Sequence, residues 1–303
     1  MKYSLKQLAV FDAVAMHESV SAAARQLSMT QSAVSMSLSQ LEHVLDRPLF
    51  IRQGNRLALS HWGRWLRPKA KHLLQEAMQI ELGLHDQQII SGNLTICSSQ
   101  TPAKHILPKL ISKIDEDFPE LHLDLMVENT DSVIQCLLNY ECDLGMVEGR
   151  IDHTGLHQQK LLDDHLVIFC NPNHPYAKLN KVNSAQLEQA KWVMREIGAG
   201  TRRIFDGAIH GIIEHIDVCK IYESVQVLKA LVENGVYLSC LPYLDVAQEV
   251  EKGDLVILST PQLNMDRSIS FIWRKNTGEN PLRDCVLREA QRLVSNSKKA
   301  KTR

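Results

Sequence analysis

Residues 19–42 read SVSAAARQLSMTQSAVSMSLSQLE, a pattern typical of two short helices joined by a tight turn. Ser21 can cap the first helix, and the alanines that follow it allow close packing. Ser28 and Met29 form the turn, and Thr30 is placed to cap the second helix. The stretch therefore predicts a helix-turn-helix motif.

The second helix of this pair carries one apolar stripe and one bare face. Apolar residues recur at steps of three and four and predict a buried stripe: Val34, Leu38, Leu41 and Leu45. Short hydroxyl side chains let a helix approach phosphates and base edges, and glutamine can read adenine in the major groove. The candidate DNA-binding residues on the bare face and at its start are Thr30, Gln31, Ser32, Ser35, Met36 and Ser39. The alternative is that the two helices form an ordinary amphipathic helical hairpin inside a core.

A β-hairpin is expected directly after this helix. Pro48 stops the helix because it has no backbone N–H to donate. Residues 49–52 and 56–59 are predicted as two short strands around a turn. Arg52 and Arg56 are placed to contact backbone phosphates. Such a β-hairpin beside a helix-turn-helix is called a wing. Its presence favours DNA binding over the alternative of a helical hairpin buried in a core.

A long helix follows, with Ser60 as its cap. Its apolar residues form a seam like that of a coiled coil: Trp62, Leu66, Ala70, Leu73, Ala77, Ile80 and Leu84. Because no partner for this seam is expected within the chain, we expect a second copy to bury it. Pro68 lies inside this helix and should kink it.

Charge is distributed unevenly along a chain whose net charge is −1. Residues 1–71 hold ten Lys or Arg against four Asp or Glu, whereas residues 91–303 hold 24 against 28. A basic head on a mildly acidic body places the attraction for DNA where the helix-turn-helix lies.

The remaining composition argues against export, membrane insertion and catalysis. Met1–Ala13 lacks the apolar core of a signal peptide, and no apolar run has membrane-spanning length. The seven cysteines are scattered and odd in number, which favours reduced thiols in the cytoplasm. We therefore expect a cytoplasmic chain with no membrane partner, no cofactor and no catalytic residue.

Two side-chain pairs leave weaker alternatives. His153 and His157 are four residues apart, but Gly155 between them indicates a loop, so no metal site is expected. Cys136 and Cys142 are the closest cysteines in sequence and leave a redox switch as an alternative.

After Gln88 the pattern changes to alternating strands and helices, which predicts parallel sheets covered on both faces. The expected strands are 94–97, 121–127, 144–147, 166–170, 192–195, 218–222, 236–241, 255–258 and 268–273. Helices are expected at 102–117 and 281–295, with others capped by Thr130, Ser184, Thr201 and Ser224. The basic tail 295–303 is expected to be disordered.

Ligands of open α/β sheets bind at the carboxyl ends of strands, near helix N-termini that favour anions. Two loops and one strand end have this position. The candidate effector-binding residues are Ser98, Ser99, Gln100, Thr101, Glu148, Arg195, Gly200 and Thr201. The hydroxyls suit an oxyanion, Gly200 permits close backbone approach, and Arg195 supplies charge. The alternative is that these residues are ordinary caps and turns.

The N-terminal segments resemble the LysR-type transcriptional regulators. The resemblance rests on LKQLAVFDAVAMHESVSAAARQLSMTQSAVSMSLSQLE (residues 5–42) and LDRPLFIRQGNRLALSHWG (residues 45–63). Met36 and Ser37 depart from the family, which often carries Arg, Lys or Gln there, so base preference is not carried over. The run WVMREIGAGTR, residues 192–202, is similar to a subgroup that includes regulators of sulfur assimilation and carbon fixation.

The resemblance implies a winged helix-turn-helix at residues 1–60, a linker helix at 61–90 and an effector domain at 91–303. It implies two Rossmann-like lobes, as in periplasmic solute-binding proteins, with lobe 1 at about 91–164 and 267–303 and lobe 2 at about 165–266. It also implies a homodimer or homotetramer on double-stranded promoter DNA, with RNA polymerase as a further candidate partner. The subgroup implies a small anionic effector, such as sulfite or a phosphorylated acid.

Two other function classes remain as alternatives. A solute-binding module fits residues 92–303 but leaves the winged helix without a purpose. A metabolic enzyme with an accessory DNA-binding domain lacks candidate catalytic residues. Neither the effector, the target genes nor the direction of regulation follows from the sequence.

Overall fold

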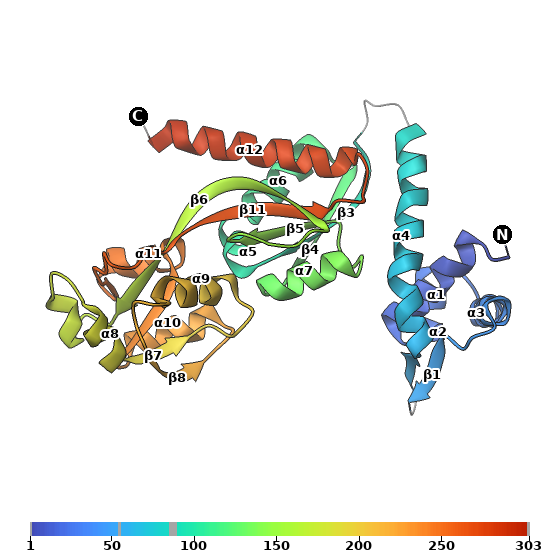
Figure 1. The fold of residues 1–303 in the computed structure, drawn as a ribbon. Coiled ribbons are helices and arrows are strands. Elements are labelled where there is room, and N and C mark those ends of the chain that lie inside the picture. The colour runs from blue at the N-terminus through green and yellow to red at the C-terminus, as the bar shows by residue number, and fades with distance from the viewer. Residues whose placement is uncertain (1, 54–55, 85–89, 302–303) are drawn as a thin grey trace. The chain divides into compact units, whose positions relative to one another are not determined.

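The computed structural model describes residues 2–53, 56–84 and 90–301. They belong to two compact units, one formed by residues 1–89 and 138–141 and one formed by residues 90–137 and 142–303. Figure 1 shows the first as helices with a short hairpin and the second as an α/β fold.

The first unit is a winged helix-turn-helix followed by a long helix. Its elements are α1 (Leu5–His17), α2 (Val20–Gln26), α3 (Gln31–Leu45), β1 (Phe50–Gln53), β2 (Arg56–Leu59) and α4 (His61–Leu84). Strands β1 and β2 pair antiparallel, as expected for a wing. The predicted stripe of α3 is buried in the core at Val34, Leu38 and Leu41, beside the fully buried Phe11. Burial of this stripe decides which face of α3 points outward.

The caps of this unit agree with the sequence at two positions and differ at one. Thr30 Oγ1 accepts from the Ala33 N–H at 3.2 Å, and Ser60 Oγ accepts from the Gly63 N–H at 3.0 Å, so both predicted caps are confirmed. Ser19, not Ser21, caps α2. A cap needs extended backbone just before the helix, and Ser21 already lies inside the first turn.

Helix α3 ends before the predicted stop. Its last residue is Leu45, because Asp46 adopts a left-handed conformation with φ at 52°. Pro48 follows two residues later and therefore lies outside the helix.

The apolar side chains of α4 divide between two faces. Ala70 is fully buried and Leu66 packs on the core of the first unit, so the prediction that the whole seam lacks a partner within the chain is wrong for these two. The side chain of Leu84 lies outside the described residues. Helix α4 continues past Pro68, and the kink there stays a prediction. Large apolar side chains that remain exposed on α4 are Trp62, Trp65, Leu73 and Ile80.

The second unit is built on one mixed sheet with the strand order β4-β3-β5-β11-β6-β9-β7-β8, and β10 pairs with β6. Its strands are β3 (Gly92–Ser98), β4 (Leu121–Val127), β5 (Leu144–Glu148), β6 (Leu156–Cys170), β7 (Lys191–Met194), β8 (Asp217–Ile221), β9 (Tyr237–Pro242), β10 (Val256–Ile257) and β11 (Asp266–Arg274). Strand β3 is parallel to β4 and β5, and β7 is parallel to β8 and β9. Strands β6, β10 and β11 pair antiparallel, so the expectation of parallel sheets holds only within each group.

Two long strands, β6 and β11, cross between these groups (Figure 1). Residues 156–165 of β6 pair with β11, and residues 166–169 pair with β9. We call the β3–β5 group with its helices lobe 1, and the β7–β10 group with its helices lobe 2. The sequence predicted only the apolar last third of β6, residues 166–170, because the part of the strand before it is rich in polar residues.

Helices pack on both lobes. They are α5 (Gln100–His105), α6 (Leu107–Asp117), α7 (Thr130–Leu138), α8 (Ser184–Gln189), α9 (Gly200–Ile209), α10 (Val225–Glu233), α11 (Tyr243–Lys252) and α12 (Pro281–Lys301), with a 3₁₀ turn η1 (Pro175–Lys178). The helix expected at 102–117 is two helices that break at Ile106. Helix α12 runs beyond residue 295, where a disordered tail was expected.

Three of the four predicted caps in this unit are corrected. Ser224 caps α10, as predicted. Asn129 Oδ1 accepts from the Ser132 N–H at 2.9 Å, Asn183 caps α8, and Ala199 precedes α9 without a side-chain cap. The three residues predicted as caps, Thr130, Ser184 and Thr201, lie inside their helices. The hydroxyls of Thr130 and Thr201 therefore make other contacts.

Candidate functional site

The outward face of α3 carries the residues predicted to bind DNA. Thr30, Gln31, Ser32, Ser35, Met36 and Ser39 are all exposed. Thr30 Oγ1 and Ser32 Oγ lie 3.1 Å apart at the start of the helix. This face therefore combines short polar side chains with an exposed helix start, which suits contact with phosphates and base edges.

The wing presents one of its two predicted phosphate-binding residues within the described part of the chain. Arg52 on β1 is exposed. Arg56 of β2 pairs through its backbone with Gln53 of β1, but the side chain of Arg56 lies outside the described residues.

Residues from both lobes line a small cavity in the second unit. Its volume is about 10 Å³, room for about one water molecule. The cavity is lined by Ser99, Gln100, Asn129, Thr130, Glu148, Arg195, Ala199, Gly200 and Thr201. Of the predicted effector-binding residues, Ser98 and Thr101 lie outside this lining. The fold thus brings together six predicted residues from three separate segments.

The loop 98–101 was expected to expose its hydroxyls, and this expectation is wrong. Ser98, Ser99 and Thr101 are buried. Ser98 Oγ donates to the Ser99 carbonyl at 3.0 Å, and Ser99 Oγ donates to the Met146 carbonyl at 3.3 Å. The Ser99 hydroxyl thus holds the loop against β5, and the Ser98 hydroxyl is satisfied within the loop, so neither buried hydroxyl is left without a partner.

The positive charge of Arg195 is compensated within its own loop. Its guanidinium is buried and donates two hydrogen bonds to Glu196, one from Nε at 2.8 Å and one from Nη2 at 2.9 Å. The sequence predicted a charge facing the ligand. The structure instead provides a neutral pair at the wall of the cavity.

The carboxylate of Glu148 lies where the helices α7 and α9 begin. Thr130 Oγ1 donates to Glu148 Oε2 at 3.3 Å, and the Gly200 N–H donates to Thr130 Oγ1 at 3.1 Å. A Cβ at Gly200 would lie only 2.7 Å from Thr130 Oγ1 and 3.0 Å from Glu148 Oε2. Gly200 therefore permits a close approach to its backbone, as predicted. The groups that approach it are Thr130 and Glu148 of the chain itself, not a ligand.

Arg267 connects the two lobes and was not predicted. Its buried guanidinium donates to Thr101 Oγ1 at 3.3 Å and to Thr201 Oγ1 at 3.1 Å. Its charge is compensated by Asp164 at 2.7 Å, and Glu148 Oε1 lies 3.8 Å away. The sequence prediction began this strand at Ser268, one residue too late to include the arginine.

Asp245 of α11 forms a second link between the lobes, through its contacts with α5. Lys104 Nζ donates to Asp245 Oδ1 at 3.1 Å, and His105 Nε2 lies 2.8 Å from the same oxygen. Burial alone would raise the pKa of Asp245, but the hydrogen bond from His105 and the charge of Lys104 outweigh it and lower that pKa below its usual value.

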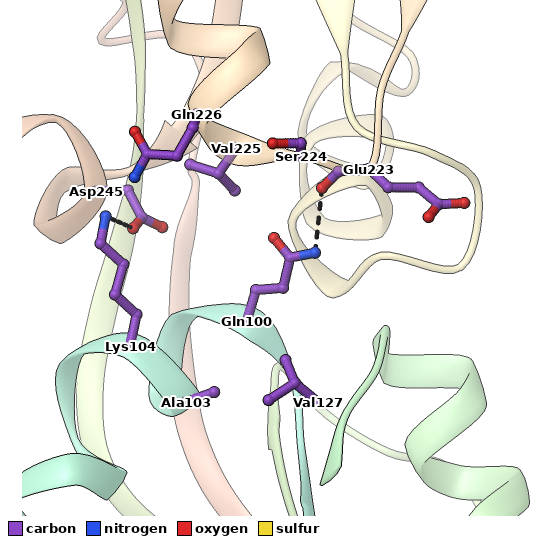
Figure 2. A pocket seen from close by; sticks show the side chains of 9 residues that line it. All are labelled: Gln100, Ala103, Lys104, Val127, Glu223, Ser224, Val225, Gln226 and Asp245. Atoms are coloured by element: carbon purple, nitrogen blue, oxygen red, sulfur yellow. Dashed lines mark hydrogen bonds and ion pairs between the residues drawn. The ribbon is translucent and has the colours of Figure 1, made fainter.

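A larger cavity of about 570 Å³ lies beside this link (Figure 2). The Gln100 amide spans it and donates to the Glu223 carbonyl at 3.1 Å, while Lys104 reaches Asp245 from the same helix. Gln100 thus borders both cavities and ties α5 to the start of α10.

Cys142 of lobe 1 and Cys170, at the end of β6 in the core of lobe 2, are both buried. A hydrogen bond with Cys97 and burial raise the pKa of the Cys142 thiol, and burial raises the pKa of Cys170 to about 12. A raised pKa keeps a thiol protonated and unreactive, which disfavours the redox alternative for these residues. Among residues 2–53, 56–84 and 90–301, no group of three metal-binding side chains comes together, and no helix is both long and apolar enough to cross a membrane.

Comparison with protein families matches both units. Residues 5–64 match the family described as bacterial regulatory helix-turn-helix protein, lysR family, and residues 87–294 match the LysR substrate binding domain. The chain belongs to the LysR family. It is therefore a DNA-binding transcriptional regulator with an effector-binding domain. LysR regulators bind promoter DNA and are generally not enzymes.

Individual LysR-family proteins are similar over nearly the whole chain. An uncharacterized HTH-type transcriptional regulator, YeiE of Escherichia coli K12, is 32% identical, and the match covers 95% of this chain and 96% of that protein. The RuBisCO operon transcriptional regulator of Allochromatium vinosum is 29% identical over 97% of this chain and 98% of that one, which agrees with the subgroup indicated by residues 192–202. A full-length variant of OxyR from Pseudomonas aeruginosa has a similar fold, with a TM-score of 0.76, 17% identity and coverage of 95% and 97%.

Proposed function

We propose that this LysR-family regulator binds its promoter through the outward face of α3 and through Arg52 and Arg56. A small effector bound between the two lobes then alters that binding. We assign residues 1–60 to the DNA-binding domain, 61–90 to the linker and 91–303 to the effector domain. Because the target is promoter DNA, we place the protein in the cytoplasm.

One observation carries the effector proposal: six predicted residues from both lobes line the same small cavity. A ligand there would contact the loop after β3, the end of β5 and the loop after β7. It would therefore bind one arrangement of the lobes more tightly than another, which is what a ligand needs to shift an equilibrium.

The small size of the cavity favours a small polar effector, and we propose a small anion. The starts of α7 and α9 supply partial positive charge there. The Arg195–Glu196 pair adds hydrogen-bonding groups but no net charge. Because the cavity holds only about one water molecule, a small anion needs nearby side chains to move, and a larger effector would need the lobes to open.

The exposed side chains of α4 support association with a second copy. Trp62, Trp65, Leu73 and Ile80 together leave a large apolar surface in contact with water. We propose that a second α4 covers it in a homodimer, and that effector domains join two dimers into a tetramer.

The effector proposal is tested by a thermal-shift screen of the full chain against small anions, because a ligand of the native state raises its stability by mass action. The ligand found is then titrated into Thr201→Val, which keeps the size of the side chain but removes the hydroxyl, and into Ser259→Ala, an exposed serine outside the cleft. We expect weaker binding and a smaller change in the DNA footprint only for Thr201→Val. Equal affinity in both variants would place the effector elsewhere.

A further inference from the structure

Met36 is the only large apolar side chain of α3 that is exposed. All 15 residues of this helix are described, and its apolar side chains Val34, Leu38 and Leu41 are buried. Met36 is instead 61% exposed. It lies two residues from both Val34 and Leu38, and two residues turn a helix by about 200°. Its side chain therefore leaves the helix almost directly opposite the buried stripe.

The side chains around Met36 are mostly short. Residues three or four apart are neighbours on the surface of a helix, and those of Met36 are Ser32, Ala33, Ser39 and Gln40. Ser32 Oγ lies 3.1 Å from Thr30 Oγ1, so that hydroxyl already has a partner at the helix start. Methionine is long, unbranched and adaptable in shape. Met36 therefore projects beyond the serines of this face and can fit an irregular surface.

The charge of the first unit indicates which partner covers this face. The unit belongs to a DNA-binding family, and residues 1–71 carry ten Lys or Arg against four Asp or Glu. Such an excess of positive charge attracts the phosphates of DNA. In a helix-turn-helix the second helix enters the major groove, and residues in its N-terminal part contact base edges. Met36, the sixth residue of α3, lies in that part.

Thymine is the base that suits an apolar side chain in the major groove. It presents its C5 methyl group there, whereas the edges of the other bases are described by hydrogen-bond donors and acceptors. A methionine pressed against those polar groups would bury them without a partner, which disfavours binding. Against the methyl group, both surfaces are apolar and both lose contact with water, which favours binding.

We propose that Met36 is a specificity-determining residue that contacts the C5 methyl group of a thymine in the operator. This inference rests on the proposed contact between α3 and the major groove. It implies that each half-site carries a T·A pair opposite Met36. It also implies that the methyl group itself, rather than a hydrogen bond to the base, determines the preference at that pair.

The test removes the methyl group from the DNA alone. The wild-type full chain first selects its site from a pool of random duplexes. Each thymine of that site is then replaced singly by deoxyuridine, which pairs in the same way but lacks the C5 methyl. Gel shifts at low salt, where DNA binding is strongest, measure the affinity. We expect the wild type to bind roughly fourfold more weakly at one substituted thymine of each half-site, as for one buried methyl group.

Three variants assign this response to Met36. Met36→Ala should bind the thymine and uracil forms of that position equally, because it has no side chain to contact the methyl group. Met36→Leu keeps an apolar side chain and should keep most of the response. The control Met16→Ala removes a methionine of α1 that is also 61% exposed and should respond as wild type does. Circular dichroism checks folding, which alanine favours on an exposed helical position.

A selected site in which no thymine responds to uracil overturns the inference, and so does a response that persists in Met36→Ala. Loss of all DNA binding by Met36→Ala at low salt also overturns it, since one apolar contact cannot account for so large an effect. In each of these cases the wild type has still selected a site, and the proposed function stands. A wild-type chain that selects no site from the pool would overturn the inference and the proposed DNA contact together.

Discussion

Arg195 and Glu196 are adjacent in sequence, and their side chains form two parallel hydrogen bonds at 2.8 and 2.9 Å. Both are largely buried at the wall of the cleft. Paired in this way, Arg195 acts on a ligand through an oriented neutral pair rather than as a lone positive charge. Because each side chain neutralises the other, removal of either one would leave the other charge buried without its partner.

We expect Arg195→Ala to lose the effector-dependent change in DNA footprint while its affinity for DNA without effector stays nearly unchanged. The substitution leaves the Glu196 carboxylate without its cation beside the proposed subsite, which disfavours an anion there. Calorimetry and footprinting with the screened effector measure both properties. The double variant Arg195→Gln/Glu196→Gln keeps the pair neutral and should be less impaired. Wild-type effector affinity in Arg195→Ala would refute the cleft assignment.

Ser35→Glu should abolish operator binding without unfolding the protein. Ser35 is exposed on the outward face of α3, so a carboxylate there meets the phosphates of DNA rather than the core. A gel shift measures binding, and circular dichroism measures folding. The control Ser259→Glu makes the same change at an exposed serine of the effector domain. Normal operator binding by Ser35→Glu would show that this face does not enter the groove.

Arg52→Ala should weaken binding to every DNA sequence and reduce the salt slope by roughly one unit, because one phosphate contact releases about one counterion. Affinity measured at several salt concentrations, with operator and with unrelated DNA, gives the slope. A loss confined to the operator would instead assign Arg52 to base recognition.

Ile80→Glu should shift the protein toward smaller assemblies. Ile80 is 65% exposed on α4, and a charge there would have to be buried in the proposed dimer contact. Light scattering at micromolar concentration measures the assembly. Leu179→Glu, at an exposed leucine of the other unit, is the matched control. A wild-type chain that is monomeric under these conditions would rule out the contact.

Asp245→Asn should destabilise the second unit by about 1–3 kcal/mol at pH 7, because it removes a buried charged acceptor of Lys104 and His105. The pKa of Asp245 is lowered in the folded state. Its stabilising effect is therefore complete above the unfolded value of about 3.9 and is lost as the pH falls through the lower folded pKa. Urea unfolding of both proteins from pH 7 to pH 3 should show a constant difference that shrinks only below about pH 4. A difference that grows on acidification would contradict this.

The outward face of α3 was predictable because it depends on spacing within one helix. Positions three and four residues apart share a face, so the apolar residues of α3 assign the outward side without knowledge of any partner. The wing and the effector-domain strands follow from equally local patterns. Caps were less predictable: Ser21, Thr130, Ser184 and Thr201 suit that role chemically, but each lies within the helix that it was expected to begin.

The sequence by itself determined the family, the outward face of α3 and the loops that approach the cleft. Only the tertiary structure decided what lies inside the cleft. Arg267 meets Asp164 across 103 residues, and Thr101 meets Asp245 across 144. No periodicity links positions so far apart, and their contact arises from the crossing strands and the packing of two lobes. For the same reason the partner of Arg195 and the place of Glu148 became visible only when the chain was folded.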